Sequence, residues 1–254
     1  MRYPDEILAV EMSSYCNLRC PMCTQCQVDY GKKGFMDIAL WKKLIDEFAN
    51  SGVKYEKFLP FGLGESLLHP KAYEMLAYMF EKNKDRTIFG HIILHTNALL
   101  MDERISDLML KCQYQIGALH FSLDAASPET YSKVRPGAEL SRAIINIVYF
   151  LKHRSQIPPK VVLQFIVMKR NFNEANNFLK FWSEVLTGLG LSFQVNYDWQ
   201  PEMLRDTIFF KRENTWNPAD LGQSEELHKK VALRLGLITE IPTGRLLVSD
   251  EFVK

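Results

Sequence analysis

Four of the five cysteines in this chain lie close together near its start, in the stretch YCNLRCPMCTQC. They are Cys16, Cys20, Cys23 and Cys26, and the fifth is Cys112. In a reducing compartment, thiols grouped this tightly indicate a soft metal rather than disulfides. Zinc sites usually take two ligand pairs from separate segments, whereas one loop with three or four cysteines can wrap an iron–sulfur cluster. The chain has no second pair, so we expect an iron–sulfur cluster.

The spacing of the cysteines allows two sets of ligands. Cys20, Cys23 and Cys26 are separated by two residues each, as in a ferredoxin-like run. Cys16, Cys20 and Cys23 have a gap of three residues and then a gap of two. The spacing alone leaves both sets open. A third possibility, in which all four thiolates are ligands, describes an iron–sulfur electron carrier or a zinc-binding module.

The elements that must position this loop alternate regularly. Apolar runs of strand length alternate with helical patterns through six units, although the sixth strand has no clear partner helix. This alternation predicts parallel strands with right-handed crossovers. The number of residues per strand–helix unit is close to that of a (β/α)8 barrel. We therefore predict an α/β fold, a partial (β/α)6 TIM-like barrel. Its chemistry is expected at the carboxyl ends of the strands. The expected strands are residues 7–12, 57–62, 91–97, 118–124, 160–168 and 191–197.

The regular alternation ends near residue 200. We therefore divide the chain into a core barrel, residues 1–200, and an irregular C-terminal extension, residues 201–254. Within the extension we expect one helix that Ser224 would cap and one short strand in the stretch RLLVSDEF. From their position, the stretch DWQPEMLRDTIFF and the tail helix are expected to cover the mouth of the barrel and set specificity.

The CNLRCPMC spacing, directly after an opening strand, resembles the radical S-adenosylmethionine (radical SAM) superfamily. In that family three cysteines hold three irons of a 4Fe–4S cluster, and S-adenosylmethionine binds the fourth iron. The resemblance implies that Cys16, Cys20 and Cys23 are the ligands and that Cys26 is an ordinary thiol just past the loop, because a fourth thiolate would take the iron that the cofactor needs. It also implies that an electron from the cluster splits the cofactor into methionine and a 5′-deoxyadenosyl radical, which takes a hydrogen atom from a substrate.

Later segments resemble the family's cofactor-binding segments in the same order. In FGLGESLLHP, Gly64 and Glu65 match a segment whose backbone carbonyls hold the methionine amino group. In LHTNALL, Asn97 is expected to donate a hydrogen bond near the cluster. In FSLDAASPETYSKVRPG, Ser122 and Arg135 match the groups that contact the methionine carboxylate, which suits a bidentate arginine.

Four more residues complete the expected cofactor site. Asp124, in the same segment as Ser122, is expected to serve the polar network of the site or the substrate. Gln164 is a polar residue inside an apolar strand, and the resemblance makes it a ribose candidate. Met168, with Val167, is a candidate for packing on adenine, and so is Met22 between the second and third cluster cysteines.

The substrate and the net reaction are left open by the sequence, and no catalytic residue is assigned. Many relatives with the SLDA segment modify peptides or oxidise alcohols, and they carry a cysteine-rich C-terminal extension. No cysteine follows Cys112 here, so we expect a one-cluster enzyme or a piece of a longer chain. The substrate is expected to be a peptide or a sugar or other alcohol. The expected partner is an external one-electron reductant of the flavodoxin or ferredoxin type.

The composition of the chain bears on whether it binds nucleic acid or a membrane. The chain has 31 basic and 30 acidic residues, a net charge of +1, which argues against a surface that coats nucleic acid. No apolar run reaches the roughly 20 residues that span a bilayer, and no signal segment begins the chain. We therefore expect a cytoplasmic protein that binds neither nucleic acid nor membrane.

Overall fold

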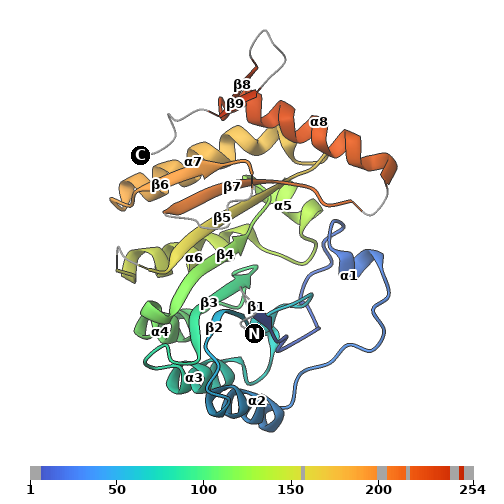
Figure 1. Cartoon of the computed structure of the whole chain (residues 1–254). Coiled ribbons are helices and arrows are strands. Elements are labelled where there is room, and N and C mark those ends of the chain that lie inside the picture. Colours follow the sequence, from blue (N-terminus) through green and yellow to red (C-terminus); the bar gives the residue numbers. More distant parts are fainter. Residues whose placement is uncertain (1–6, 156–157, 199–204, 216–217, 241–245, 249–254) are drawn as a thin grey trace.

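The structure is a computed structural model that describes residues 7–155, 158–198, 205–215, 218–240 and 246–248. Its strands and helices alternate along the chain, as expected (Figure 1). The strands are β1 (Ile7–Ala9), β2 (Tyr55–Leu59), β3 (Phe89–Thr96), β4 (Ile116–Ser122), β5 (Lys160–Val167), β6 (Phe193–Asn196), β7 (Asp206–Arg212), β8 (Ile238–Glu240) and β9 (Leu246–Val248). The α-helices are α1 (Thr24–Gln27), α2 (Ile38–Asn50), α3 (Ala72–Lys82), α4 (Glu103–Lys111), α5 (Pro128–Val134), α6 (Leu140–His153), α7 (Ala175–Gly188) and α8 (Pro218–Arg234).

Seven strands form one sheet, in the order β1-β2-β3-β4-β5-β7-β6. Every neighbouring pair in this sheet is parallel. In the described residues a helix lies between the two strands of each pair except β6 and β7, as parallel pairing usually requires. All six strands that the sequence predicts are present, with small differences at their ends. The sheet is open, so the prediction of an α/β fold and a partial TIM-like barrel is confirmed.

The sixth position of the sheet differs from the expectation. Strand β7 comes from the segment that was expected to be irregular, and it lies between β5 and β6. A buried ion pair fixes its first residue, because Asp206 binds Arg154 at the end of α6 and also accepts a hydrogen bond from the N–H of Val161, 2.8 Å away. The expected boundary at residue 200 therefore falls between two strands of one sheet.

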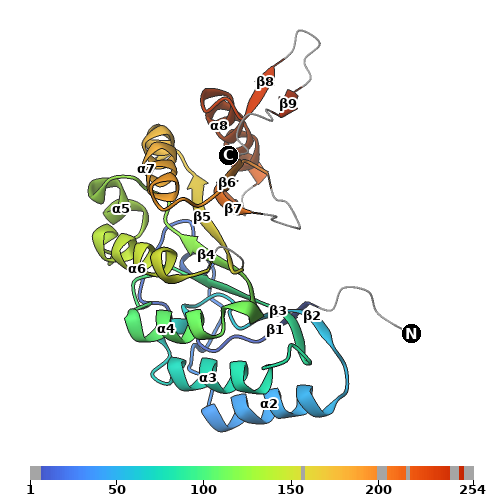
Figure 2. The same ribbon diagram turned by 90° about the vertical axis from the view of Figure 1, so that its left-hand side faces the viewer.

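The two faces of the sheet have different surroundings. Helices α2 to α7 form an arc around the outer face (Figure 2). Side chains of that face are buried, for example Phe58, Leu119, Phe165 and Phe210. The opposite, concave face carries several partly exposed side chains. Because helices cover only one face, the concave face is available for a ligand.

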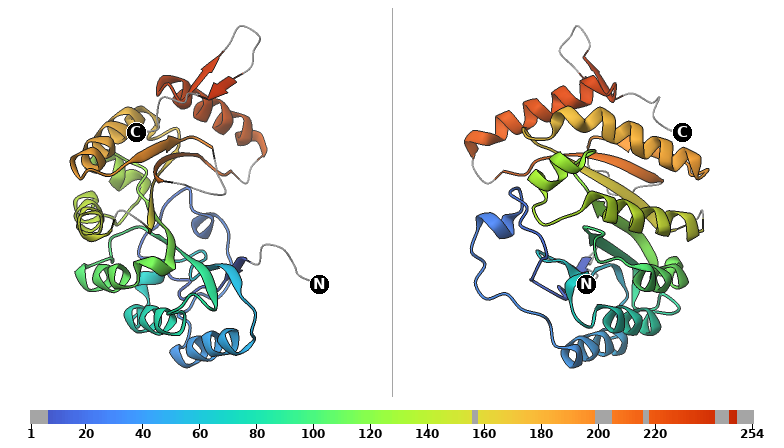
Figure 3. Two further views of the ribbon diagram at one scale, coloured as in Figure 1. Left: turned by 60° about the vertical axis from the view of Figure 1, so that its left-hand side comes forward. Right: turned by 180° about the vertical axis from the view of Figure 1, so that it is seen from behind.

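The C-terminal part adds to the barrel. Helix α8 packs against β5 and β7, and a short antiparallel hairpin, β8 and β9, follows it (Figure 3). The helix begins at Pro218 rather than at Ser224, so the prediction of a Ser224 cap is wrong. The Ser224 hydroxyl instead donates to the carbonyl oxygen of Glu213, 2.8 Å away. No helix in the described ranges is long and apolar enough to cross a membrane.

Candidate active site

The cysteine loop follows β1 at the carboxyl ends of the strands. Cys20 is buried, Cys16 and Cys23 are half-buried, and Cys26 is exposed on the single turn α1. Burial raises the pKa of Cys16, and it raises that of Cys20 to about 11. The charges of Cys16 and Cys23 also act on Cys20, so the three thiols lie near one another. No three histidine, cysteine or acidic side chains in the described part of the chain are arranged to hold a single metal ion.

A glycine holds the start of this loop in place. The N–H of Gly64, after β2, donates to the Glu11 carboxylate at 2.7 Å, and the next N–H, that of Glu65, donates to the Tyr15 carbonyl oxygen at 2.9 Å. A Cβ on Gly64 would lie 2.0 Å from the carbonyl oxygen of Ser13 and 2.6 Å from that of Tyr15. Only glycine can approach this backbone so closely. Gly64 therefore contacts the residues that lead into Cys16.

The carboxylate of Glu65 ties the ends of β2 and β3 together. It is buried and accepts hydrogen bonds from the Thr96 hydroxyl and the Asn97 N–H, each at 2.9 Å. The side chain of Asn97 in turn donates to Asn17, beside Cys16, at 2.9 Å. It also accepts from the N–H of Leu99 at 3.1 Å, which is the turn-capping role of an asparagine. Glu65 and Asn97 thus connect the second and third strand ends to the cysteine loop.

Asp124 and Arg135 form a buried ion pair beside the same loop. The guanidinium lies 2.5 Å from the carboxylate, and both side chains are removed from solvent. Arg135 also donates to the carbonyl oxygen of Leu123 at 3.1 Å, and its Nη1 lies 3.8 Å from the sulfur of Cys20. The second oxygen of Asp124 accepts from the N–H of Ile166 at 2.6 Å. The structure therefore joins the fourth strand end, the fifth strand and the cysteine loop through these two charges.

The remaining predicted residues are divided between the concave face and the core. Ser122 and Gln164 are register partners on β4 and β5, so they share the concave face. Met22 is half-buried in the cysteine loop. Met168 is buried just past β5, and its neighbour Val167 shares the face of Phe165, which packs on α7. The structure thus brings Ser122 and Gln164 together but turns Val167 away from them.

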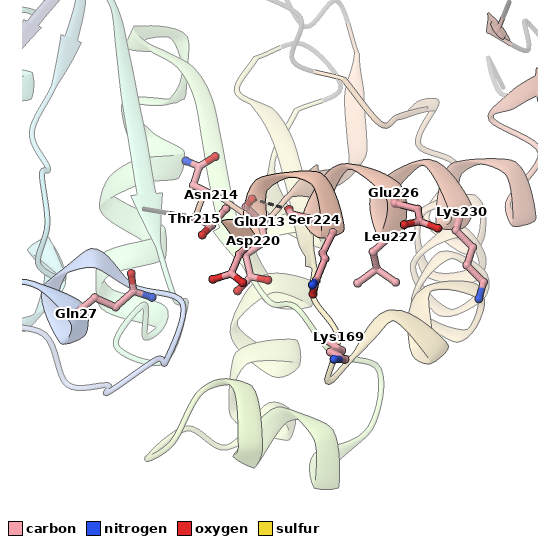
Figure 4. A pocket seen from close by; sticks show the side chains of 11 residues that line it. Gln27, Lys169, Glu213, Asn214, Thr215, Asp220, Ser224, Glu226, Leu227 and Lys230 are labelled. Carbon is pink, nitrogen blue, oxygen red and sulfur yellow. Dashed lines mark hydrogen bonds between the residues drawn. The ribbon is translucent and has the colours of Figure 1, made fainter. Parts of the chain in front are cut away.

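A polar cavity adjoins the cysteine loop on the side of α8 (Figure 4). Its volume is about 680 Å³, a common size for a small-molecule site. Gln27 of α1 faces it from one side, Lys169 and Glu213 follow β5 and β7, and the first half of α8 supplies much of the rest. The complete lining is Gln27, Lys169, Glu213, Asn214, Thr215, Asp220, Gln223, Ser224, Glu226, Leu227 and Lys230. The cavity thus lies at the barrel mouth, next to the expected cluster loop.

Residues 10–181 match the family model of the radical SAM superfamily, which is more than half of the chain. The chain belongs to the radical SAM superfamily. Its members use a 4Fe–4S cluster and S-adenosylmethionine, so this radical SAM protein is an enzyme with those cofactors. The loop suits the cluster, because it brings three thiols near one another and because Gly64 fixes the backbone just before the first of them.

Known proteins similar to this radical SAM protein share its core. A protein of Pyrococcus furiosus named "Tungsten-containing aldehyde ferredoxin oxidoreductase cofactor-modifying protein" is 24% identical over 209 residues, covering 80% of this chain and 54% of that protein. The chain thus spans about half the length of this curated relative. The solved structure "Native anSMEcpe with bound AdoMet" has a TM-score of 0.62 at 16% identity, covering 90% of this chain and 59% of that one. The hydrogenase maturase HydG from Carboxydothermus hydrogenoformans has a TM-score of 0.54 at 12% identity, covering 90% and 51%. These likenesses show the fold.

Several residues that support the site were not predicted from the sequence. Asn171 donates to the carbonyl oxygens of Asp124 and Ile166, both at 2.8 Å, and so braces the ends of β4 and β5. Glu174 accepts from the N–H groups of Ala126 and Ser127 and holds the segment after Asp124. The only signal for Asn171 was its place shortly after an apolar strand. No local pattern indicated Glu174, because its partners lie more than forty residues away.

Proposed function

We propose that Cys16, Cys20 and Cys23 hold the cluster and that Cys26 lies outside it. The exposure of Cys26 on α1, against the burial of Cys20, supports this choice. When bound, the cluster and S-adenosylmethionine supply a 5′-deoxyadenosyl radical that takes a hydrogen atom from the substrate. The chain's own residues then have two tasks, to position both cofactors and to keep water from the radical.

We assign the cofactor contacts to residues at the ends of β4 and β5 and in the cysteine loop. Ser122 and Gln164 lie on the concave face and can donate to the carboxylate and the ribose of S-adenosylmethionine. Arg135 stays protonated in its ion pair with Asp124, and its guanidinium is the proposed contact for the methionine carboxylate. Gly64, Glu65 and Asn97 act mainly through the loop, because their hydrogen bonds join segments of the protein itself. Met22 and Met168 remain the proposed adenine contacts.

The substrate that we propose is a peptide or a sugar or other alcohol that binds at the barrel mouth. The cavity between α1 and α8 carries this proposal, because it joins the cysteine loop to the ends of β5 and β7 and is lined almost entirely by polar side chains. Burial raises the pKa of Glu213 in its wall, while Arg170 opposes that rise and Asp220 adds to it. A site of this kind offers both hydrogen-bond donors and hydrogen-bond acceptors, which the hydroxyl and amide groups of a substrate require.

A second candidate substrate is a cofactor or its precursor. The relative from Pyrococcus furiosus is named as a cofactor-modifying protein, and its similarity covers 80% of this chain. The electron source that we propose in either case is a flavodoxin or a ferredoxin. The predicted cytoplasmic location stays a prediction, and the five free thiols are in keeping with a reducing compartment.

Deuterium transfer tests the substrate class. The anaerobically reconstituted chain is reduced with dithionite in the presence of S-adenosylmethionine and perdeuterated peptides, sugars or cofactor precursors. We expect 5′-deoxyadenosine to gain deuterium from a peptide or a sugar, measured by mass spectrometry. Gain from the precursors alone would replace this proposal with the second candidate, and gain from none of the compounds would contradict both.

The cavity has its own test within the same assay. With the substrate that transfers deuterium, Glu213→Gln is expected to raise KM about tenfold, since a charged hydrogen bond is worth roughly 1.5–3 kcal/mol. Glu184→Gln, on the exposed face of α7, is the matched control and should leave KM unchanged. Equal KM values for the two variants would show that the substrate binds elsewhere.

A further inference from the structure

The concave face of the sheet carries a group of polar side chains that the cofactor contacts do not use. His95 and His120 are register partners on β3 and β4. His120 is in turn the partner of Val162 on β5, which alternates with Gln164 and Ile166 along the concave face. Ile166 is the register partner of Lys211 on β7, so Lys211 points to the same face. Three strands thus direct two imidazoles and one ammonium group into the open barrel.

The two imidazoles belong to a column of stacked rings. Phe61 lies 4.2 Å from the ring of His95, and His95 lies 4.0 Å from the ring of His120, with interplanar angles of 18° and 17°. Burial lowers the pKa of His95 well below its usual value, and it lowers that of His120 to about 4. Both rings are therefore neutral near pH 7. A neutral imidazole has one N–H group to donate and one nitrogen to accept a hydrogen bond.

Lys211 is a partly buried cation that has no acidic partner within 4.0 Å in the part of the chain that the structure describes. The acid whose charge acts on it is Asp124. The carboxylate of Asp124 is occupied, because one oxygen binds Arg135 and the other binds the N–H of Ile166. A cation withdrawn from water without a counter-ion costs free energy, which an anionic ligand would recover.

We propose that Lys211, with the N–H groups of His95 and His120 beside it, binds an anionic group of the substrate, a carboxylate or a phosphate. The charge of Lys211 acts on both histidines, which places the three groups around one region of the barrel. Lys211 lies nearer the carboxyl ends of the strands than His120 does, so an anion entering from the mouth meets Lys211 first. The inference rests on the proposed function, since it describes the substrate of that site.

Phosphate binding tests the inference without turnover. Inorganic phosphate is titrated by calorimetry into the reconstituted full chain, first without and then with saturating S-adenosylmethionine. We expect Lys211→Met to bind phosphate about tenfold more weakly than the wild type, which corresponds to about 1.4 kcal/mol. Lys211→Arg, which keeps the charge, is expected to stay within about threefold of the wild type. Lys180→Met, on the exposed face of α7, removes an equal charge and should change nothing.

Three results would overturn the inference. The first is an absence of phosphate binding by the wild type, and the second is equal binding by the wild type and Lys211→Met. The third is loss of phosphate binding when S-adenosylmethionine is added, because Lys211 would then hold the cofactor carboxylate and not the substrate. Far-UV circular dichroism and the Lys211→Arg variant show whether Lys211→Met is folded. Because no step of the reaction is measured, failure here is distinct from failure of the deuterium-transfer test.

Discussion

The guanidinium of Arg135 lies 2.5 Å from the carboxylate of Asp124 and 3.8 Å from the sulfur of Cys20, inside the protein. One arginine thus connects the end of β4 to a cysteine more than a hundred residues earlier in the chain. Its charge also opposes the effect of burial on the Cys20 thiol, whose pKa is raised to about 11. A metal ligand must be a thiolate, so under the proposed ligand set this contact links the stability of the barrel to the formation of the cluster.

The ion pair predicts a large loss of stability when one partner is removed. Arg135→Met leaves Asp124 buried without its counter-ion, so the free energy of unfolding should fall by about 3–5 kcal/mol. Urea denaturation measures this change. Arg135→Met combined with Asp124→Asn should recover much of the loss, because asparagine keeps the hydrogen bonds and tolerates the positive φ of 66° at that position.

The exposed pair Lys133–Glu129 on α5 is the matched control for this prediction. Lys133→Met should leave the denaturation midpoint nearly unchanged, since exposed ion pairs contribute little. If Arg135→Met and Lys133→Met behaved alike, the buried pair would have no part in holding β4 to the cysteine loop.

Gly64 predicts a steric effect on the cysteine loop. In Gly64→Ala the new Cβ would overlap the carbonyl oxygen of Ser13, so the loop must shift. We expect lower stability, by about 1–3 kcal/mol as for other overpacked sites, and reduced iron content after reconstitution. Iron and sulfide analysis measures the second effect. Gly188→Ala, at the end of α7, is the control, because a Cβ there meets nothing within 4 Å and alanine favours a helix.

The cysteine assignment predicts unequal iron retention. Alanine at Cys16, Cys20 or Cys23 removes one of three ligands, and each variant is expected to lose most of its 4Fe–4S absorbance and all dithionite-dependent cleavage of S-adenosylmethionine. Cys26→Ala is expected to keep both, because Cys26 is exposed on α1. Loss of cleavage in Cys26→Ala would make Cys26 a ligand and contradict the choice of three.

His120 predicts a pH dependence of stability. Its pKa in the folded chain, about 4, is below the ordinary value of 6.5, so the folded state binds fewer protons than the unfolded state between these values. The stability contributed by neutral His120 is complete above about pH 6.5 and is lost as the pH falls toward 4. Denaturation curves should show the wild type losing about 3 kcal/mol more than His120→Phe between pH 7 and pH 4, at 1.36 kcal/mol per pKa unit. Parallel losses in the two proteins would mean that His120 does not titrate in this way.

Local patterns in the sequence predicted six of the seven strands of the sheet and the loop that carries the clustered cysteines. The expected strands from β2 to β6 are apolar runs with buried residues on their outer face, whereas β1 has none. The side chain of Asp37 caps α2 by accepting hydrogen bonds from the N–H groups of Ala39 and Leu40. These features depend on side chains a few residues apart, so a single segment contains the information. The spacing of Cys16, Cys20 and Cys23 is local in the same way, and the resemblance to the radical SAM superfamily begins with it.

The tertiary structure alone decided which distant groups meet. Strand β7 lies between β5 and β6 because Asp206 binds Arg154 and because the apolar residues of β7 complete the outer face of the sheet. The sequence of the β7 segment does not show that Arg154 or strand β5 will be its partner. Three other sets of contacts likewise join segments that are far apart in the sequence. They are the close approach of Gly64 to Ser13, the ion pair of Asp124 and Arg135, and the side chains of His95, His120 and Lys211 on the concave face. The periodicity of a segment records which side chains are turned inward. Which other segment they meet is set only when the whole sheet assembles, because the free energy of those contacts belongs to both partners at once.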